Sequence, residues 1–225
     1  MLDFNNNIKN IDGWLTKEEG EFLYEMARKV PENGNIVEIG SWKGRSTICL
    51  GSGSRDGSGV TVHAIDPHTG SSDTRLKFGK LDTYNEFLSN IESVGIGKYV
   101  VPLKKTSQEV ARRFNHPVSF IFVDGDHAYS SVKADHKSWF PKLVTGGVIA
   151  YHDCWNKVGV QLFTALVLLT SSQVRSPRLL DTLTIMEKTE NNSFIDRIYN
   201  LFFVFYRLFV GWTGKIKLAY GGTVE

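Results

Sequence analysis

Four apolar, β-branched runs each carry an acidic residue near their carboxyl end: Glu38 in 36–39, Asp66 after 60–65, Asp124 after 118–123, and Asp153 two residues after 148–151. Runs of this kind that alternate with helical segments predict parallel strands covered on both faces. The carboxyl ends of parallel strands share one edge of the sheet, which is where open α/β folds bind ligands. The four acids therefore predict one binding site at that edge.

The first strand runs into a glycine turn, Gly40-Ser41-Trp42-Lys43-Gly44-Arg45-Ser46. A dinucleotide fingerprint needs G-x-G-x-x-G, and Trp42 replaces its second glycine, so a pyrophosphate cradle is disfavoured. Glu38, two residues before Gly40, also disfavours a phosphate because like charges repel. A ligand with an ammonium, a carboxylate and a sulfonium fits better, since N–H groups near Ser46 can meet its carboxylate.

The elements that must position these residues follow from periodicity. Thr16 and Glu19 form a capping box that predicts a helix ending before Pro31. Further helices are expected at 45–51, 81–94, 107–114, 132–143 and 158–169, and further strands at 99–103, 174–179 and 182–187. Residues 68–80 are polar and predict an irregular functional loop. The fold class predicted is α/β, a Rossmann-like, seven-stranded, mainly parallel sheet with helices on both faces.

The motifs E-I-G-S-x-x-G-R-S-T, I-D-P, F-V-D-G-D-H-x-Y and L-V-x-G-G-V-I-x-Y-H-D occur in this order. Together they resemble the class I S-adenosylmethionine-dependent methyltransferases. The narrower likeness is to the branch with sugar and macrolide O-methyltransferases and cephalosporin hydroxylase proteins. The resemblance covers about residues 12–187.

The resemblance implies a role for each matching position. The methionine end of S-adenosylmethionine would be held by the glycine turn and its flanks: Glu38, Gly40, Ser41, Gly44 and Ser46. Asp66 would bind the ribose hydroxyls, because a carboxylate can accept hydrogen bonds from two adjacent hydroxyls. Ser107 would contact the adenine, and Asp124 would complete the cofactor site.

The residues after the fourth and fifth strands form the expected chemical end. In metal-dependent relatives, carboxylates there hold a magnesium ion, which makes Asp124 and Asp153 the expected metal ligands. His152 departs from the carboxylate often found before the second ligand, so a metal-free site with His127 or His152 as base stays open. The catalytic residues predicted are His127, His152 and Asp153. The other histidines, His63, His68, His116 and His136, are interpreted as surface or structural residues.

Composition narrows the class of protein. A net charge of +2 gives no reason to expect a nucleic-acid partner. Cys49 and Cys154 lack a CxxC spacing, so neither a disulfide framework nor a zinc site is predicted. The first ten residues have no apolar core, which argues against a secretory signal. We expect a cytoplasmic protein, with a peripheral position at the inner face of the membrane left open.

The chain is expected to divide into a methyltransferase domain, residues 1–190, and an aromatic helical extension, residues 191–225. Ser193 can cap this C-terminal amphipathic helix, and its longest uncharged run, 198–206, is well short of the ~20 residues of a membrane span. Packing on the domain, a homodimer contact, and a membrane-surface contact through 193–212 all remain open.

The predicted reaction is O-methylation of a small-molecule hydroxyl, with a sugar or glycoside as the expected acceptor. Two other classes stay open at this point. A nicotinamide-dependent oxidoreductase would share the sheet and the ribose acid. A non-catalytic adaptor would keep the fold and use the aromatic tail to bind a membrane or a partner.

Overall fold

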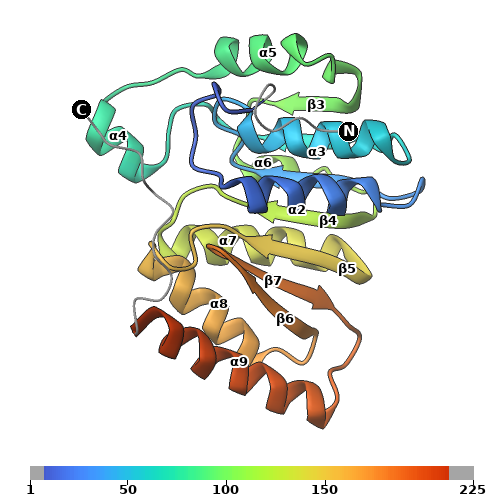
Figure 1. The fold of residues 1–225 in the computed structure, drawn as a ribbon, viewed down its shortest axis with the longest axis vertical. Coiled ribbons are helices and arrows are strands. Elements are labelled where there is room, and N and C mark those ends of the chain that lie inside the picture. Colours follow the sequence, from blue (N-terminus) through green and yellow to red (C-terminus); the bar gives the residue numbers. More distant parts are fainter. Residues whose placement is uncertain (1–7, 213–225) are drawn as a thin grey trace.

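The computed structural model describes residues 8–212, which form one twisted sheet with helices on both faces (Figure 1). The strands are β1 Ile36–Ile39, β2 Val62–Ile65, β3 Val100–Leu103, β4 Val118–Val123, β5 Leu143–Tyr151, β6 Val174–Leu180 and β7 Leu183–Lys188. The helices are α2 Lys17–Arg28, α3 Arg45–Asp56, α4 Ser72–Phe78, α5 Tyr84–Ser93, α6 Ser107–Ala111, α7 Tyr129–Trp139, α8 Val158–Thr170 and α9 Phe194–Trp212, with short 3-10 turns at Gly97–Tyr99 and Phe140–Lys142. The predicted fold class is confirmed.

The strand order is β3-β2-β1-β4-β5-β7-β6, and the first five strands in this order run parallel. β7 pairs antiparallel with both β5 and β6. Ile39 pairs with both Ile65 and Val123, and Val123 pairs with Tyr151. Because these strands end in register, the residues that follow them come out side by side at one edge.

Strand alternation divides the core into two layers. On one face, Ile36, Phe120 and Phe122 pack with α2, α3 and α5. On the other, Val37 and Ile121 pack with α6, α7, α8 and α9. All these strand residues are fully buried, as expected for a parallel sheet covered on both sides.

Three local predictions need correction. The helix expected at 45–51 runs on to Asp56, because its glycines permit close packing on α2: a Cβ at Gly53 would lie 2.2 Å from the carbonyl oxygen of Tyr24. Residues 72–78, expected to be irregular, form helix α4, which Ser71 caps by accepting from Thr74 N at 3.2 Å. The segment was missed because it is short and has no apolar face. β5 starts at Leu143 instead of Val148, because Leu143 already pairs with Val118 before a register shift.

The C-terminal helix exists and packs against β6 and α8 (Figure 1). Its start is capped as predicted, since Ser193 Oγ accepts from Asp196 N at 3.1 Å. No helix within residues 8–212 is long and apolar enough to cross a membrane. The predicted extension beyond residue 212 lies outside the described residues.

Candidate functional site

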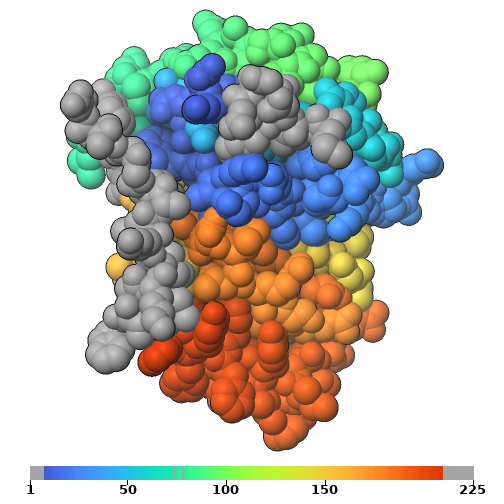
Figure 2. Space-filling model, in the orientation of Figure 1, coloured from blue at the N-terminus to red at the C-terminus, as the bar shows by residue number. Residues whose placement is uncertain are grey.

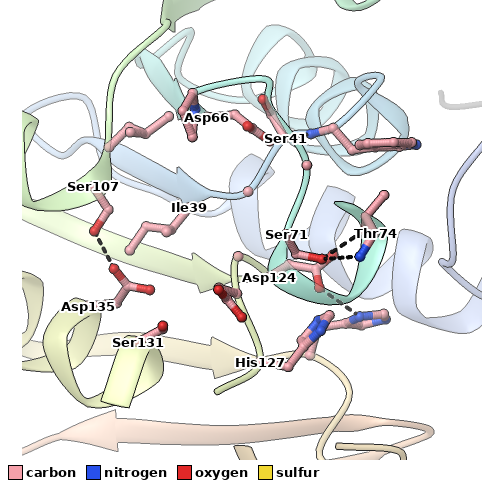
Figure 3. A pocket seen from close by; sticks show the side chains of 18 of the residues that line it. Ile39, Ser41, Asp66, Ser71, Thr74, Ser107, Asp124, His127, Ser131 and Asp135 are labelled. Atoms are coloured by element: carbon pink, nitrogen blue, oxygen red, sulfur yellow. Dashed lines mark hydrogen bonds and ion pairs between the residues drawn. The ribbon is translucent and has the colours of Figure 1, made fainter. Parts of the chain in front are cut away.

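A cavity of about 460 Å³ opens at the edge where the parallel strands end. Its size is typical of small-molecule sites. Turns after β1, β2, β4 and β5 line it, together with the starts of α3, α4 and α6, part of α7, and the segment Gly13 to Leu15. Figure 3 shows the side chains of Asp66, Ser107, Asp124 and His127 around this space.

The glycine turn after β1 forms one wall. Gly40 has φ 89°, and a Cβ there would lie 2.1 Å from the carbonyl oxygen of Asp124, so only glycine fits. Gly44 has φ 93° and precedes α3 at its N-cap. Trp42 lines the cavity, and its ring centroid lies 6.1 Å from that of Trp14, which comes from the chain before α2.

Glu38 lies behind this turn and does not line the cavity. Its carboxyl accepts from Ser46 Oγ and Thr47 Oγ1, both at 2.5 Å, and so ties β1 to the start of α3. Burial raises the pKa of Glu38 to about 8 in spite of these donors. The two hydrogen bonds brace the turn from behind the cavity wall.

Asp66 lines the cavity and is fixed by two backbone donors. Oδ2 accepts from Trp42 N at 2.8 Å and Oδ1 accepts from His68 N at 2.6 Å. Each oxygen keeps further acceptor capacity, since an ionised carboxylate has about four lone-pair sites. The arrangement joins the β1 and β2 turns and holds the carboxylate ready for ligand hydroxyls.

Ser107, at the start of α6, donates to Asp135 Oδ1 in a short hydrogen bond and accepts from Trp139 Nε1 at 3.2 Å (Figure 3). Gln108 Nε2 also donates to Asp135 Oδ1, at 2.7 Å. Burial raises the pKa of Asp135 to about 6. Asp135 thus organises the end of the cavity at which Ser107 was predicted, although it lies in the middle of α7.

His152 is buried between two carboxylates. Nδ1 lies 3.0 Å from Asp124 Oδ1 and Nε2 lies 3.2 Å from Glu19 Oε2. Burial lowers the pKa of His152, but the two carboxylates outweigh it and hold the pKa well above its usual range. Both nitrogens then act as donors, so this imidazolium cannot accept a proton from a substrate.

Glu19 was predicted only as part of the α2 capping box, and the box is present. Its carboxylate does more, because Oε1 accepts from Thr182 N at 2.9 Å and from Thr182 Oγ1 at 2.7 Å. Glu19 is fully buried. Glu19 therefore connects α2, the end of β5 and the start of β7. The spacing of residues in the sequence gives no signal for these contacts.

His127 and Asp153 form a pair that lines the cavity. His127 Nε2 lies 3.2 Å from Asp153 Oδ2. Burial lowers the pKa of His127, but the hydrogen bond to Asp153 and the charge of Asp124 outweigh burial and raise it above the usual value. Asp153 lies at φ 58°, and the histidine contact lowers its pKa to about 2 against the effect of burial. A histidine held by an ionised carboxylate is an arrangement suited to general base chemistry.

The predicted magnesium ligands lie close together, with atoms of Asp124, His152 and Asp153 within 4.8 Å of one another. Magnesium takes oxygen ligands, however, and the third donor here is a nitrogen that already faces two carboxylates. These residues are better described as a protonated His152 ring held between the carboxylates of Asp124 and Glu19 than as a magnesium site. Magnesium binding at Asp124 and Asp153 stays a prediction from the resemblance.

Most of the predicted site residues come together in the cavity. Its lining contains Gly40, Ser41, Ser46, Asp66, Ser107, Asp124, His127, His152 and Asp153. Glu38 and Gly44 stand outside the lining. Two of the histidines interpreted as surface or structural make contacts inside the protein: His68 contacts Thr83 Oγ1 at 3.0 Å, and His136 contacts the Tyr151 hydroxyl at 2.5 Å. His116 is exposed.

Comparisons with known proteins identify the family and the fold. Residues 37–154 match a family model described as a methyltransferase domain. Among curated proteins, the uncharacterized protein y4gI of Sinorhizobium fredii (strain NBRC 101917 / NGR234) is 31% identical over 121 residues, which are 52% of this chain. The match spans only 13% of the length of that relative.

Several solved structures share the fold. The O-methyltransferase NovP superposes with a TM-score of 0.64 at 16% identity, over 77% of this chain and 80% of that one. An O-methyltransferase from Bacillus cereus in complex with S-adenosylhomocysteine gives 0.54 at 19% identity, over 83% and 86%. CalS11, a TDP-rhamnose 3'-O-methyltransferase, gives 0.53 at 16% identity, over 75% and 76%.

Proposed function

The chain belongs to the methyltransferase domain family, and from that premise we propose that it methylates a hydroxyl of a sugar or glycoside. The methyl donor is S-adenosylmethionine. The observation that carries the proposal is that one cavity is lined both by Asp66, held by the glycine turn, and by the His127–Asp153 pair. A donor site and a candidate base thus face the same space.

The donor would lie along the β1 and β2 turns. Asp66 accepts hydrogen bonds from the ribose hydroxyls of S-adenosylmethionine. The backbone N–H groups at the start of α3 donate to the carboxylate of its methionine part. Ser107 and Asp135 lie at the end of the cavity that holds the adenine. Glu38, which stands outside the lining, holds the turn in place through Ser46 and Thr47 without contacting the donor. The assignments of Glu38 and Gly44 therefore change from direct contact to support.

Methyl transfer needs an oxygen nucleophile in line with the sulfonium. The acceptor oxygen attacks the methyl carbon, the carbon–sulfur bond breaks, and its electron pair stays on sulfur to give S-adenosylhomocysteine. His127 takes up the hydroxyl proton while its Nε2 donates to Asp153, whose charge stabilises the resulting imidazolium. His152 takes no part in proton transfer and orients Asp124.

The proposed acceptor class rests on the polar wall opposite the donor turns. Asp126, in the turn after β4, lines the cavity with Ser130 and Ser131 of α7, and Ser72 Oγ, on α4 behind the lining, donates to Asp126 Oδ1 at 2.8 Å. Hydroxyl and carboxylate groups are the partners that a sugar uses. CalS11, similar in fold, is a methyltransferase of a nucleotide-linked sugar.

Calorimetric titration with S-adenosylhomocysteine tests the donor site. The variant Asp66→Ala is expected to bind about 10- to 100-fold more weakly, because a charged acceptor loses its hydrogen bonds to ligand hydroxyls. Asp82→Ala is the control, since Asp82 is exposed and pairs with Lys104 instead of lining the cavity. Equal affinity of Asp66→Ala and wild type would refute the site.

The acceptor is tested by incubating the protein with S-adenosylmethionine and a panel of nucleotide-linked sugars. Product formation is followed by release of S-adenosylhomocysteine and by the mass gain of one methyl group. Methylation at nitrogen or carbon of another substrate class, with all sugars inert, would contradict the proposed acceptor and leave the donor site standing.

The two other classes of function left open by the sequence are less well supported. A nicotinamide-dependent oxidoreductase is disfavoured by the family to which residues 37–154 belong. The adaptor hypothesis depends on the C-terminal helix, whose packing on β6 and α8 is described above.

A further inference from the structure

The exposed side of α9 carries an unusual concentration of large apolar side chains. We call the outer face of α9 the surface formed by Ile198, Tyr199, Phe202, Phe205, Tyr206 and Phe209, which are 39% to 67% exposed. From residue 198 to residue 209, every exposed side chain is aliphatic or aromatic. At 100° per residue the six positions of the outer face span about a third of the helix circumference, and Leu201 and Leu208, 44% and 50% exposed, widen the apolar surface to about half.

Within residues 198–209, the charged side chain and the amide side chain, Arg207 and Asn200, point into the protein. Arg207 is fully buried, and its guanidinium donates to Thr164 Oγ1 at 2.7 Å, Thr184 Oγ1 at 3.0 Å and the Gln161 carbonyl at 2.7 Å. Asn200 Nδ2 donates to the Val174 carbonyl at 3.1 Å. A helix on a water-facing surface has the opposite arrangement, with its apolar stripe inward and its charges outward.

Helix α8 extends the apolar surface. Val158, Leu162, Leu166 and Leu169 are 44% to 67% exposed and recur at helical spacing. α8 and α9 lie side by side at the lower end of the molecule in Figure 1, and they form the orange to red part of the surface in Figure 2. A contiguous patch this large marks an interaction surface instead of ordinary exposure.

We infer that the outer face of α9, with the exposed row of α8, docks on the surface of a lipid bilayer. Interfaces between proteins have a polar rim and about one hydrogen bond per 100–200 Å², whereas residues 198–209 expose no charged group. Polar groups turned inward and apolar groups turned outward are typical of protein surfaces in contact with lipid. Phenylalanine and tyrosine side chains fit the headgroup level.

The position of α9 agrees with this occupant. Arg207, near its C-terminal end, contacts Gln161 at the start of α8, which follows the β5 end and Asp153. The C-terminal half of α9 therefore lies at the same end of the molecule as the cavity (Figure 1). Docking would leave the cavity beside the lipid surface without covering it.

Vesicle flotation of the full chain tests the inference. Wild type is expected to float with phosphatidylcholine vesicles, and to do so equally at low and at ~1 M salt because the contact is apolar and not charge-driven. Phe202→Ser, Phe205→Ser and Phe209→Ser combined are expected to weaken partitioning about 100-fold, from the lost burial of three rings. Leu76→Ser, an 88% exposed site on α4, is the control and leaves partitioning unchanged.

The triple variant changes only exposed side chains, so its thermal unfolding is expected to match wild type, and a melting scan verifies this. Light scattering distinguishes the other occupant. A stable dimer in wild type that becomes a monomer in the triple variant would overturn the inference in favour of a second copy. Failure of wild type to float, or unchanged flotation of the triple variant, would also overturn it.

Discussion

Replacing Glu19 by Gln removes one of the two carboxylates that hold the His152 ring. Glu19 accepts four hydrogen bonds, from Thr16 N at 3.0 Å, from Thr182 N and Oγ1 at 2.9 and 2.7 Å, and from His152 Nε2 at 3.2 Å. Gln can keep the bonds to Thr182, but its amide then points N–H groups at Thr16 N and at the imidazolium. Breaking one side of a buried ion pair typically costs about 3–5 kcal/mol.

For a chain of this size such a loss lowers the melting temperature by roughly 10 °C. The effect depends on pH. The pKa of Glu19 is lowered because His152 and Thr16 outweigh burial, so its contribution appears above about pH 4.3 and is lost as pH falls. The pKa of His152 is raised, so its contribution is complete below about pH 6.5 and is lost as pH rises through the raised value. The destabilisation is therefore largest between about pH 5 and 6.5.

Urea unfolding at several pH values measures the loss of free energy of unfolding in Glu19→Gln. Glu18→Gln is the matched control, because Glu18 is exposed on the same turn and its replacement is expected to stay within about 0.5 kcal/mol of wild type. A double-mutant cycle with His152→Gln isolates the coupling between the two residues. If Glu19→Gln unfolds like Glu18→Gln at pH 6, the description of His152 as a buried cation held by two acids is wrong.

Three further predictions concern the site. The kcat/KM of wild type is expected to rise with pH through a pKa above about 6.5, because the raised pKa of His127 means that its neutral form appears only at higher pH. In initial-rate assays, His127→Gln should abolish this rise and lower the rate about 10²- to 10⁴-fold. Dialysis against a chelator is expected to leave the methylation rate unchanged, whereas His152→Asp, which supplies a third carboxylate, should gain Mn²⁺ binding by calorimetry; a wild-type rate that falls with chelator and returns with Mg²⁺ would contradict this. Gly40→Ala is expected to lose about 3 kcal/mol or more in urea unfolding because its Cβ meets Asp124, while Gly95→Ala, with φ 70° and nothing within 4 Å, should lose only about 1–2 kcal/mol.

The acidic residues at the ends of the parallel strands could be predicted because their placement depends only on the local sequence pattern. Asp66 and Asp124 each follow an apolar run directly, and parallel pairing places such residues together. Glu38 followed the same logic less well, since it is the third residue of β1 and not the residue after it. Alternation along the strand turns its side chain toward Ser46 and Thr47, away from the cavity.

The partners of these residues could not be predicted from spacing. Glu19 and His152 are 133 positions apart, and the capping box already explained Glu19. Asp135 lies within a helix, where an acid usually faces water, yet it is buried against Ser107. Buried polar contacts between distant segments depend on tertiary packing, which leaves no periodic trace in one sequence.

The glycine turn after β1 and the turn that carries Asp124 touch through their backbones. Gly40 packs against the Asp124 carbonyl, and Asp124 N donates to Ile39 O at 2.7 Å. A donor molecule that shifts this turn by a fraction of an ångström must also move Asp124. Binding at one half of the cavity is therefore linked to binding at the other, and linkage is reciprocal. The two substrates are expected to add in a preferred order, with affinities that depend on each other.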